Sequence, residues 1–398
     1  MGDYSAEEAA ERAGIAVADL GRLVNLGIVS PAEGDRFTPG DIRKIGLARS
    51  LESAGIPDET LAAEIRRGRL SLDFLDNPGF DNFSALSRLT FDELGAERGI
   101  PVDLLLVIRE AIGSAVAAPT DLVRDIELAL VPLVEALLAS GYPPDTVERL
   151  LRTMGESLRR FVLAEADAFR RYVIAPVGHL SGPEIGAAGA AAAARMAGPA
   201  DAALLAVYHA QQAHAWTANM IAGFEQQLAE AGLYSRAERP PAMCFLDITG
   251  YTKLTAERGD KAAADLADQL GRLVQRTSLE HGGRPVKWLG DGVMLYFREP
   301  GPGVVAALGM TDAVANAGLP PAHVGLHAGP VLFQDGDYYG QTVNVASRIA
   351  EYARPGEVLV SQAVVDTAAG SAVTFSAIGP VELKGVAGSI DLYVARRS

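Results

Sequence analysis

The stretch AMCFLDITGY, residues 242–251, has the pattern of a short buried strand that ends at an acidic residue and then turns. Apolar residues fill most of the run, Asp247 lies near its end, and Gly250 supplies the turn. A long amphipathic helix is expected next, from about Lys261 to His281. The sequence therefore places a carboxylate between a buried strand and a helix.

A second stretch, RPVKWLGDGVMLYF at residues 284–297, has two apolar runs on either side of Gly290-Asp291-Gly292. This pattern is typical of a β-hairpin. Carboxylates such as Asp247 and Asp291 are the ligands that Mg²⁺ prefers. Two acids 44 positions apart are also common as surface or turn residues, so the pair alone does not identify a metal site.

A third stretch, DGDYYGQTVNVASRI at residues 335–349, predicts a turn followed by a helix. Asn344 and Arg348 are four positions apart, so both side chains leave the same helix face. An arginine and an asparagine so placed could hold a phosphate and a ribose. An ordinary helix with a solvated arginine has the same pattern.

Taken together, the three motifs resemble the class III nucleotidyl cyclase catalytic domain in order and spacing, over about residues 240–396. The motifs are FLDITGYT at 245–252, VKWLGDGVMLYF at 286–297 and DYYGQTVNVASR at 337–348. The resemblance implies an α+β fold, a ferredoxin-like βαββαβ core with extra strands, preceded here by an all-α N-terminal region. It also implies a homodimer with active sites at the interface between catalytic domains.

The resemblance also implies a role for individual residues. Two aspartates and one backbone carbonyl would bind metal: Asp247, Asp291 and Ile248. Backbone amides of one turn would cradle phosphates: Thr249, Gly250, Tyr251 and Thr252. Asn344 would orient the ribose, Arg348 would stabilise the transition state, and Lys384 would be a further triphosphate contact.

Lys287 and Asp337 correspond to the pair that selects the purine. Adenine offers an acceptor at N1 and a donor at its 6-amino group, which a lysine donor and an aspartate acceptor complement. Guanine presents O6 and N1–H, which this pair would mismatch. The sequence therefore favours ATP as the substrate.

The implied reaction is that of an adenylate cyclase, a phosphorus–oxygen lyase. The ribose 3′-hydroxyl attacks the α-phosphorus in line, and 3′,5′-cyclic AMP and pyrophosphate form with the help of two Mg²⁺ or Mn²⁺ ions per site. One subunit would supply the metal aspartates and the other would supply the remaining motif residues. Two alternatives stay open: a guanylate cyclase of the same fold, or a non-enzymatic MerR-like regulator with a degenerate cyclase domain.

Composition limits the partners and the location of the chain. The 398 residues include 35 Lys and Arg against 50 Asp and Glu, a net charge of −15 that argues against a long nucleic acid as partner. The one cysteine, Cys244, excludes an internal disulfide and a Cys-based zinc cage. Residues 1–10 lack a targeting pattern, and the apolar run Leu128–Ser140 is too short to span a membrane. We therefore expect a cytoplasmic protein without a membrane segment.

The chain divides by composition into three regions, 1–118, 119–235 and 236–398, with the linker-like run RAERPP at 236–241. The first region is helical and contains a weak repeat, in which the segments from Tyr4 and from Leu89 each predict a helix–turn–helix. The first copy, with a further helix at Ile42–Ala54, resembles the N-terminal domain of MerR-type regulators. Residues 1–75 carry 9 basic and 13 acidic side chains, however, which argues against DNA binding.

The second region predicts a helical bundle with a regulatory or dimerisation role and an unknown signal. Its apolar residues recur at helical spacing over 122–137 and 147–161, which indicates a core within one chain or shared between two. Residues 187–194 could form a helix or a flexible connector. His209 and His214 are interpreted as packing residues, because their five-residue offset does not suit a helical metal pair.

Overall fold

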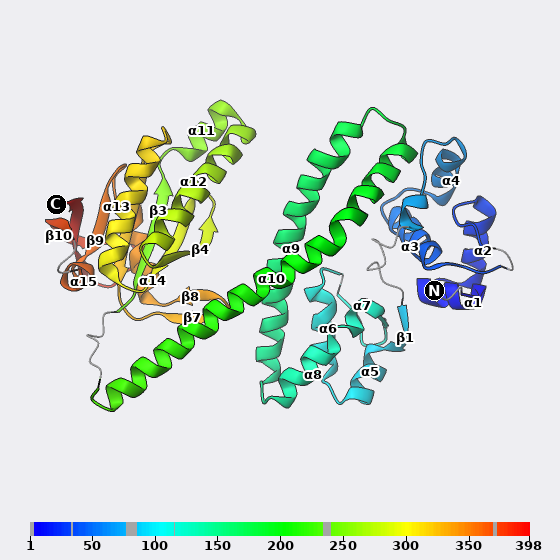
Figure 1. Ribbon diagram of the computed structural model, residues 1–398, viewed down its shortest axis with the longest axis horizontal. Coiled ribbons are helices and arrows are strands. Elements are labelled where there is room, and N and C mark those ends of the chain that lie inside the picture. The colour runs from blue at the N-terminus through cyan, green and yellow to red at the C-terminus, as the bar shows by residue number, and fades with distance from the viewer. Residues whose placement is uncertain (1–3, 33–34, 77–85, 115, 234–239, 369–371) are drawn as a thin grey trace. The chain divides into compact units, whose positions relative to one another are not determined.

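The computed structural model describes residues 4–32, 35–76, 86–114, 116–233, 240–368 and 372–398 (Figure 1). The chain forms two compact units, Met1–Gly223 and Phe224–Ser398.

The C-terminal unit contains the predicted βαββαβ core. Its elements are β3 (Ala242–Ile248), α11 (Tyr251–Arg258), α12 (Asp260–Glu280), β4 (Gly283–Leu289), β5 (Gly292–Phe297), α13 (Pro300–Asn316) and β6 (Ala322–Ala328). The four strands lie side by side in the order β6-β3-β5-β4, and each neighbouring pair is antiparallel. This arrangement confirms the ferredoxin-like core, and α12 and the β4–β5 hairpin lie where the sequence predicted them.

Further elements extend this core. Strands β9 (Val358–Ser361), β11 (Ser389–Arg397) and β10 (Val373–Glu382) continue the sheet beyond β6. A small hairpin of β7 (Leu332–Gln334) and β8 (Asp337–Tyr339) precedes α14 (Gln341–Tyr352), and α15 (Gln362–Thr367) follows β9.

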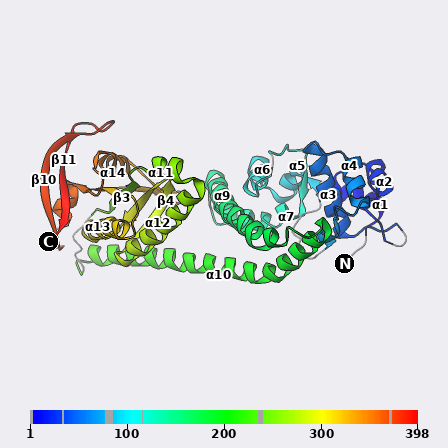
Figure 2. The same ribbon diagram turned by 90° about the horizontal axis from the view of Figure 1, so that it is seen from above.

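The alternation of side chains along β3 separates the two faces of the sheet. Cys244, Leu246 and Ile248 are buried in one core with residues of α12 and α13. Met243 points the other way, into a second core with Ala346 of α14. Figure 2 shows α12 and α13 on one side of the sheet and α14 on the other. Because Asp247 follows the same alternation, it lies on the α14 face.

One glycine sets how closely α14 approaches the sheet. A Cβ at Gly325 of β6 would lie 2.1 Å from the backbone nitrogen of Ala350. Only glycine leaves room for the helix backbone at this distance. Helix α14, which carries two of the predicted site residues, is therefore held directly against the central strands.

The N-terminal unit is mostly helical. It comprises α1 (Ala6–Ala13), α2 (Val17–Leu26), α3 (Pro39–Ser53), α4 (Asp58–Arg66), η1 (Asp73–Asp76), β1 (Leu86–Thr90), α5 (Phe91–Arg98), α6 (Val102–Ala111), β2 (Leu122–Arg124), α7 (Asp125–Leu128), α8 (Val131–Ala139), α9 (Pro144–Phe169), the π-helix η3 (Arg170–Ile174), η4 (Ala175–Val177) and most of α10 (Gly182–Glu230).

Both copies of the sequence repeat form the expected helix–turn–helix, α1–α2 and α5–α6. Each first helix begins with a capping box, at Ser5 in one copy and Thr90 in the other. Each ends at a glycine in the left-handed conformation, Gly14 and Gly99, both with φ 66°. The two copies contribute to separate apolar cores, one within residues 9–75 and one within 91–151.

The expectation of an all-α N-terminal region was incomplete. Strands β1 and β2 pair antiparallel, and Leu122, which we expected in a helix, lies in β2. Helix periodicity over 122–137 misplaced this residue because a three-residue strand leaves too short a pattern to detect. The apolar segment Leu128–Ser140 is largely helical, as α8.

Two long helices, α9 and α10, answer points that the sequence left open. Leu158 and Phe161 of α9 are exposed and lie outside the apolar core that α9 forms within the N-terminal unit. Residues 187–194 are helical, within α10. By length and composition alone, α10 could cross a membrane, and only 11% of its most apolar window is buried. One helix that passes this test is weak evidence for a membrane span. Of the predicted linker 236–241, residues 236–239 lie outside the described part of the chain.

Candidate active site

Asp247 and Asp291 come together at one end of the central strands. Asp247 is the penultimate residue of β3, and Asp291 lies in the two-residue connection between β4 and β5. Both line a pocket of about 190 Å³, which we call the acid pocket. Its other lining residues come from the neighbouring strands and from α14: Phe245, Leu246, Leu289, Gly292, Val293, His323, Ser347, Ala350 and Glu351.

The charge in the acid pocket suits a divalent cation. Burial, and then the nearby negative charge of Asp291, raise the pKa of Asp247 above the ordinary carboxyl value. A bound cation would relieve both effects. Among the described residues, no three His, Cys, Asp or Glu side chains cluster closely enough to hold a metal by themselves. Two carboxylates without a full protein cage fit Mg²⁺, which commonly takes its other ligands from water and substrate phosphates.

The turn after β3 is anchored to β6. The Thr249 backbone N–H donates to the Pro321 carbonyl at 3.0 Å, and the Thr249 hydroxyl lies 3.2 Å from Nδ1 of His323. Gly250 adopts φ 79° directly before α11, so the turn leads into a helix N-terminus, where backbone amides can face an anion. The Tyr251 hydroxyl donates to the Ala263 carbonyl, so its ring packs toward α12. The Thr252 side chain lies outside what the structure describes.

The predicted purine-selecting residues contact each other directly. Lys287 of β4 donates from Nζ to Oδ2 of Asp337 on β8, and Oδ1 of Asp337 accepts from the Tyr338 backbone at 2.8 Å. The Tyr338 ring stacks on Tyr296 of β5, with 4.6 Å between ring centroids. This stacking fixes β8 against β5, next to β4, and so brings together two residues that are 50 positions apart.

Helix α14 presents Asn344 and Arg348 on one face. Asn344 is exposed, and the Arg348 side chain is 39% exposed. Nη1 of Arg348 donates to both carboxylate oxygens of Glu351, at 2.5 and 2.6 Å. Neither Asn344 nor Arg348 lines the acid pocket, and neither do Lys287 and Asp337. Within one chain, the described site residues therefore fall into two sets, an acid set and a nucleotide-reading set.

Lys384 lies near the helix that carries the nucleotide-reading set, because its neighbour Leu383 packs in one apolar core with Val345 and Ile349 of α14. It is exposed, in the connection between β10 and β11. These strands end the sheet at the edge opposite the β4–β5 hairpin. The sequence resemblance alone supports Lys384 as a triphosphate contact.

Comparison with protein families agrees with this geometry. Residues 233–396 match the adenylate and guanylate cyclase catalytic domain. The C-terminal part of the chain is a nucleotidyl cyclase domain. This match confirms the enzyme class predicted from the sequence, a cyclase that acts as a phosphorus–oxygen lyase.

Curated relatives match both the cyclase domain and the region before it. The chain is 26% identical over 324 residues to the pH-sensitive adenylate cyclase MT1302 of Mycobacterium tuberculosis, which covers 77% of each chain. It is 28% identical over 375 residues to the uncharacterized protein Mb2235 of Mycobacterium bovis, covering 92% of this chain and 91% of that one. An adenylate cyclase of Streptomyces coelicolor is 32% identical over 130 residues, 32% of this chain and 34% of the relative.

Among solved structures, the adenylyl cyclase CyaB from P. aeruginosa is similar to this chain. The match has a TM-score of 0.37 and 22% identity, and covers 40% of this chain and 95% of that chain.

Three polar residues that line the acid pocket of the cyclase domain were not predicted as site residues from the sequence: His323, Ser347 and Glu351. His323 pairs in register with Asp247 across β6 and β3. This pairing joins strands that are far apart in the sequence, so no local pattern could reveal it. Ser347 and Glu351 could have been noticed, because both lie near Arg348 on the predicted helix.

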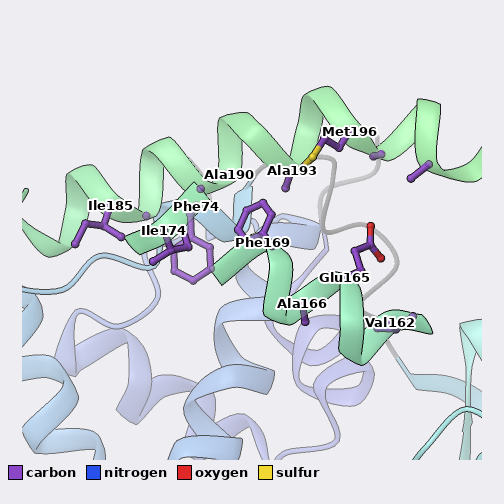
Figure 3. A pocket seen from close by; sticks show the side chains of 14 residues that line it. Phe74, Val162, Glu165, Ala166, Phe169, Ile174, Ile185, Ala190, Ala193 and Met196 are labelled. Carbon is purple, nitrogen blue, oxygen red and sulfur yellow. The ribbon is translucent and has the colours of Figure 1, made fainter. Parts of the chain in front are cut away.

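A second cavity lies outside the cyclase domain, in the N-terminal unit. It has a volume of about 470 Å³ and lies between α9, η3, α10 and Phe74 of η1 (Figure 3). Aromatic, aliphatic and small residues form its wall, and Glu165 is the one charged residue in the lining. A nucleotide triphosphate does not fit such a wall, because it would lose its hydration without gaining donors or positive charge. The acid pocket is therefore the better candidate for the chemistry.

Proposed function

We propose that this protein is an adenylate cyclase, which converts ATP to 3′,5′-cyclic AMP and pyrophosphate. The direct pairing of Lys287 and Asp337 is the observation that favours ATP as the substrate. It places one donor, on β4, beside one acceptor, on β8. That arrangement complements the N1 and 6-amino edge of adenine. The names of the relatives from Mycobacterium tuberculosis and Streptomyces coelicolor support the same substrate.

Residues at the end of β3, and in the turns that follow β3 and β4, would bind the metal ions and the phosphates. Asp247, Asp291 and the Ile248 carbonyl would hold Mg²⁺ or Mn²⁺, two ions per site. When bound, these ions supply positive charge for the attacking 3′-oxygen and for the leaving pyrophosphate. The backbone amides of residues 250–252 would bind phosphate oxygens. The predicted amide of Thr249 is not available for this role, because it already donates to the Pro321 carbonyl.

Asn344 and Arg348 act from α14. Asn344 would hold the ribose so that its 3′-oxygen faces the α-phosphorus. The guanidinium of Arg348 would leave Glu351 and stabilise negative charge that builds up on the phosphate. Both roles require a nucleotide that reaches from the acid set to the nucleotide-reading set.

A homodimer would bring those two sets together. The acid pocket of one chain contains none of Lys287, Asp337, Asn344 and Arg348, so a partner chain can supply them. Large apolar side chains are exposed on the two hairpins beside the site: Trp288, Leu289, Leu332, Phe333 and Tyr339. An exposed apolar group of this kind is typical of a surface that another chain covers. Two equivalent sites follow from a two-fold axis.

Residues 1–235 would regulate catalysis by setting how two cyclase domains face each other. The relative named a pH-sensitive adenylate cyclase matches over 77% of this chain, more than the cyclase domain alone, which supports a regulatory role for this region. The resemblance of its first part to MerR-type regulators is retained as a proposal for the fold, not for DNA binding, and we propose a cytoplasmic location. Equal activity of the full chain and residues 236–398, across pH and protein concentration, would argue against this regulation.

The central test is a cyclic-nucleotide assay on purified full-length protein with ATP or GTP, and with Mg²⁺ or Mn²⁺. We expect cyclic AMP from ATP with at least one of the two metals and much slower turnover of GTP. Preferential turnover of GTP would favour the guanylate cyclase alternative. Absence of turnover with either nucleotide would favour the non-enzymatic regulator.

A further inference from the structure

We infer that His323 is a positioning residue for the metal-binding carboxylate of Asp247. His323 lies on β6 directly opposite Asp247 on β3, and its side chain is 15% exposed. Both residues line the acid pocket. The inference rests on the proposed metal site, and it concerns a residue that none of the three sequence motifs contains.

The two ring nitrogens of His323 face different partners. Nδ1 lies 3.2 Å from the Thr249 hydroxyl, and Nε2 lies 3.6 Å from Oδ2 of Asp247. When the Thr249 hydroxyl donates to Nδ1, the neutral ring carries its proton on Nε2. The N–H group then points toward the carboxylate. The ring thus joins the phosphate-binding turn to the metal-binding acid.

The two oxygens of Asp247 consequently have different surroundings. Oδ1 lies over Gly292, where a Cβ would be only 3.1 Å away, on the side of the hairpin that carries Asp291. Oδ2 faces His323. The contact between Nε2 and Oδ2 is longer than a hydrogen bond, so the N–H group favours this orientation of the carboxylate by electrostatic attraction. Partners that orient a ligating carboxylate contribute to metal affinity, and their loss costs about 10–100-fold.

The anchoring of β6 makes His323 a rigid support. The Thr249 amide bonds to Pro321, two residues before His323, and the Val324 amide bonds to the Glu357 carbonyl at 2.9 Å. The histidine therefore lies between two backbone hydrogen bonds that fix its strand. Its ring can hold Asp247 without help from a mobile loop.

The test measures Mn²⁺ binding to the full-length protein, without nucleotide, from the electron paramagnetic resonance signal of free Mn²⁺. His323→Gln can place an N–H near the position of Nε2, whereas His323→Asn reaches only toward Thr249 and His323→Leu offers no donor. We expect about tenfold weaker Mn²⁺ binding for the Asn and Leu variants and less than threefold change for Gln. His281→Gln, in the same unit but outside the acid pocket, is the matched control and should bind as the wild type does.

Each outcome decides the question. Unchanged affinity in the Asn and Leu variants overturns the inference, and so does equal weakening in all three, because that would indicate a need for the ring's bulk rather than its donor. If the Leu variant does not fold, the contrast between Gln and Asn gives the same decision. If the wild type itself binds no Mn²⁺, the proposed metal site fails, which is a different result from failure of His323.

Discussion

Two cavities in the described part of this chain have walls of opposite chemical character. The acid pocket of the cyclase domain lies at the end of a tightly packed sheet, and its two aspartates come from β3 and from the connection between β4 and β5. The cavity of the N-terminal unit lies between helices, and apolar and small residues form nearly all of its wall. The first can attract cations and, through them, phosphates; the second can accept only apolar groups. The two units therefore offer cavities of different chemistry, one suited to cations and phosphates and one to apolar groups.

The largest expected effect concerns the division of the site between two chains. Asp247→Ala removes a metal carboxylate, and Arg348→Ala removes the guanidinium, so each variant alone should lose about 10³-fold in turnover. Mixed together, the two variants should recover activity, because one of the two sites in a mixed dimer is intact. Cyclic AMP production by the mixture, measured against each variant alone, checks this. Failure to recover would indicate that one chain builds a complete site.

A smaller effect is expected for the purine-selecting pair. Lys287→Gln keeps a donor but removes the charge that faces Asp337, so kcat/KM for ATP should fall about 10–100-fold, which corresponds to about 1.4–2.8 kcal/mol. The preference for ATP over GTP should also narrow. The ratio of kcat/KM for the two nucleotides measures it. Lys261→Gln, which changes an exposed lysine of α12 to which no role is assigned, is the control and should leave both kcat/KM values unchanged.

The packing difference between the two units gives a third prediction. Gly325→Ala places a Cβ 2.1 Å from the backbone of α14, so the catalytic unit should lose about 1–3 kcal/mol of stability. Ala193→Leu adds a side chain toward the N-terminal cavity and should leave its unit unchanged or more stable by up to about 1 kcal/mol. Calorimetry of the full chain can detect both changes. A destabilising Ala193→Leu would indicate that the cavity cannot accept apolar groups.

The sequence predicted the catalytic unit better than the N-terminal unit, for physical reasons. Strand β3, α12 and the β4–β5 hairpin have strong local patterns, and the motif residues Lys287 and Asp337 meet as expected. His323 was missed because its importance comes from strand pairing with Asp247. The apolar residues of α9 lie on a helix at the predicted spacing, but Phe161 among them is exposed in the single chain. Periodicity shows that a face is apolar and does not show what covers it.

The smallest expected effect is on the stability of the metal-free protein. Because burial raises the pKa of Asp247, the folded state binds its proton more tightly than the unfolded state does. Stability should therefore fall as pH rises from the ordinary carboxyl pKa, about 4, to neutral. Asp247→Asn removes this penalty, which is about 0.5 kcal/mol for a half-exposed group, and should raise Tm by about 1–2 °C at pH 7 without metal. Thermal unfolding in a chelator checks this, and Asp312→Asn, on the surface, should show no such gain.

The ion pair between Lys287 and Asp337 also affects how the protein discriminates between bases. Each side chain already has a partner of opposite charge, so this pair has no net charge and leaves the attraction of metal ions to the acid pocket. When a base binds, the ion pair between Lys287 and Asp337 breaks, and each side chain bonds to the base instead. Only a base with an acceptor facing the lysine and a donor facing the aspartate compensates for the loss of the ion pair. Without a base, the ion pair therefore occupies the same donor and acceptor that the proposed substrate would use. A base that cannot bond to both side chains competes poorly with the ion pair.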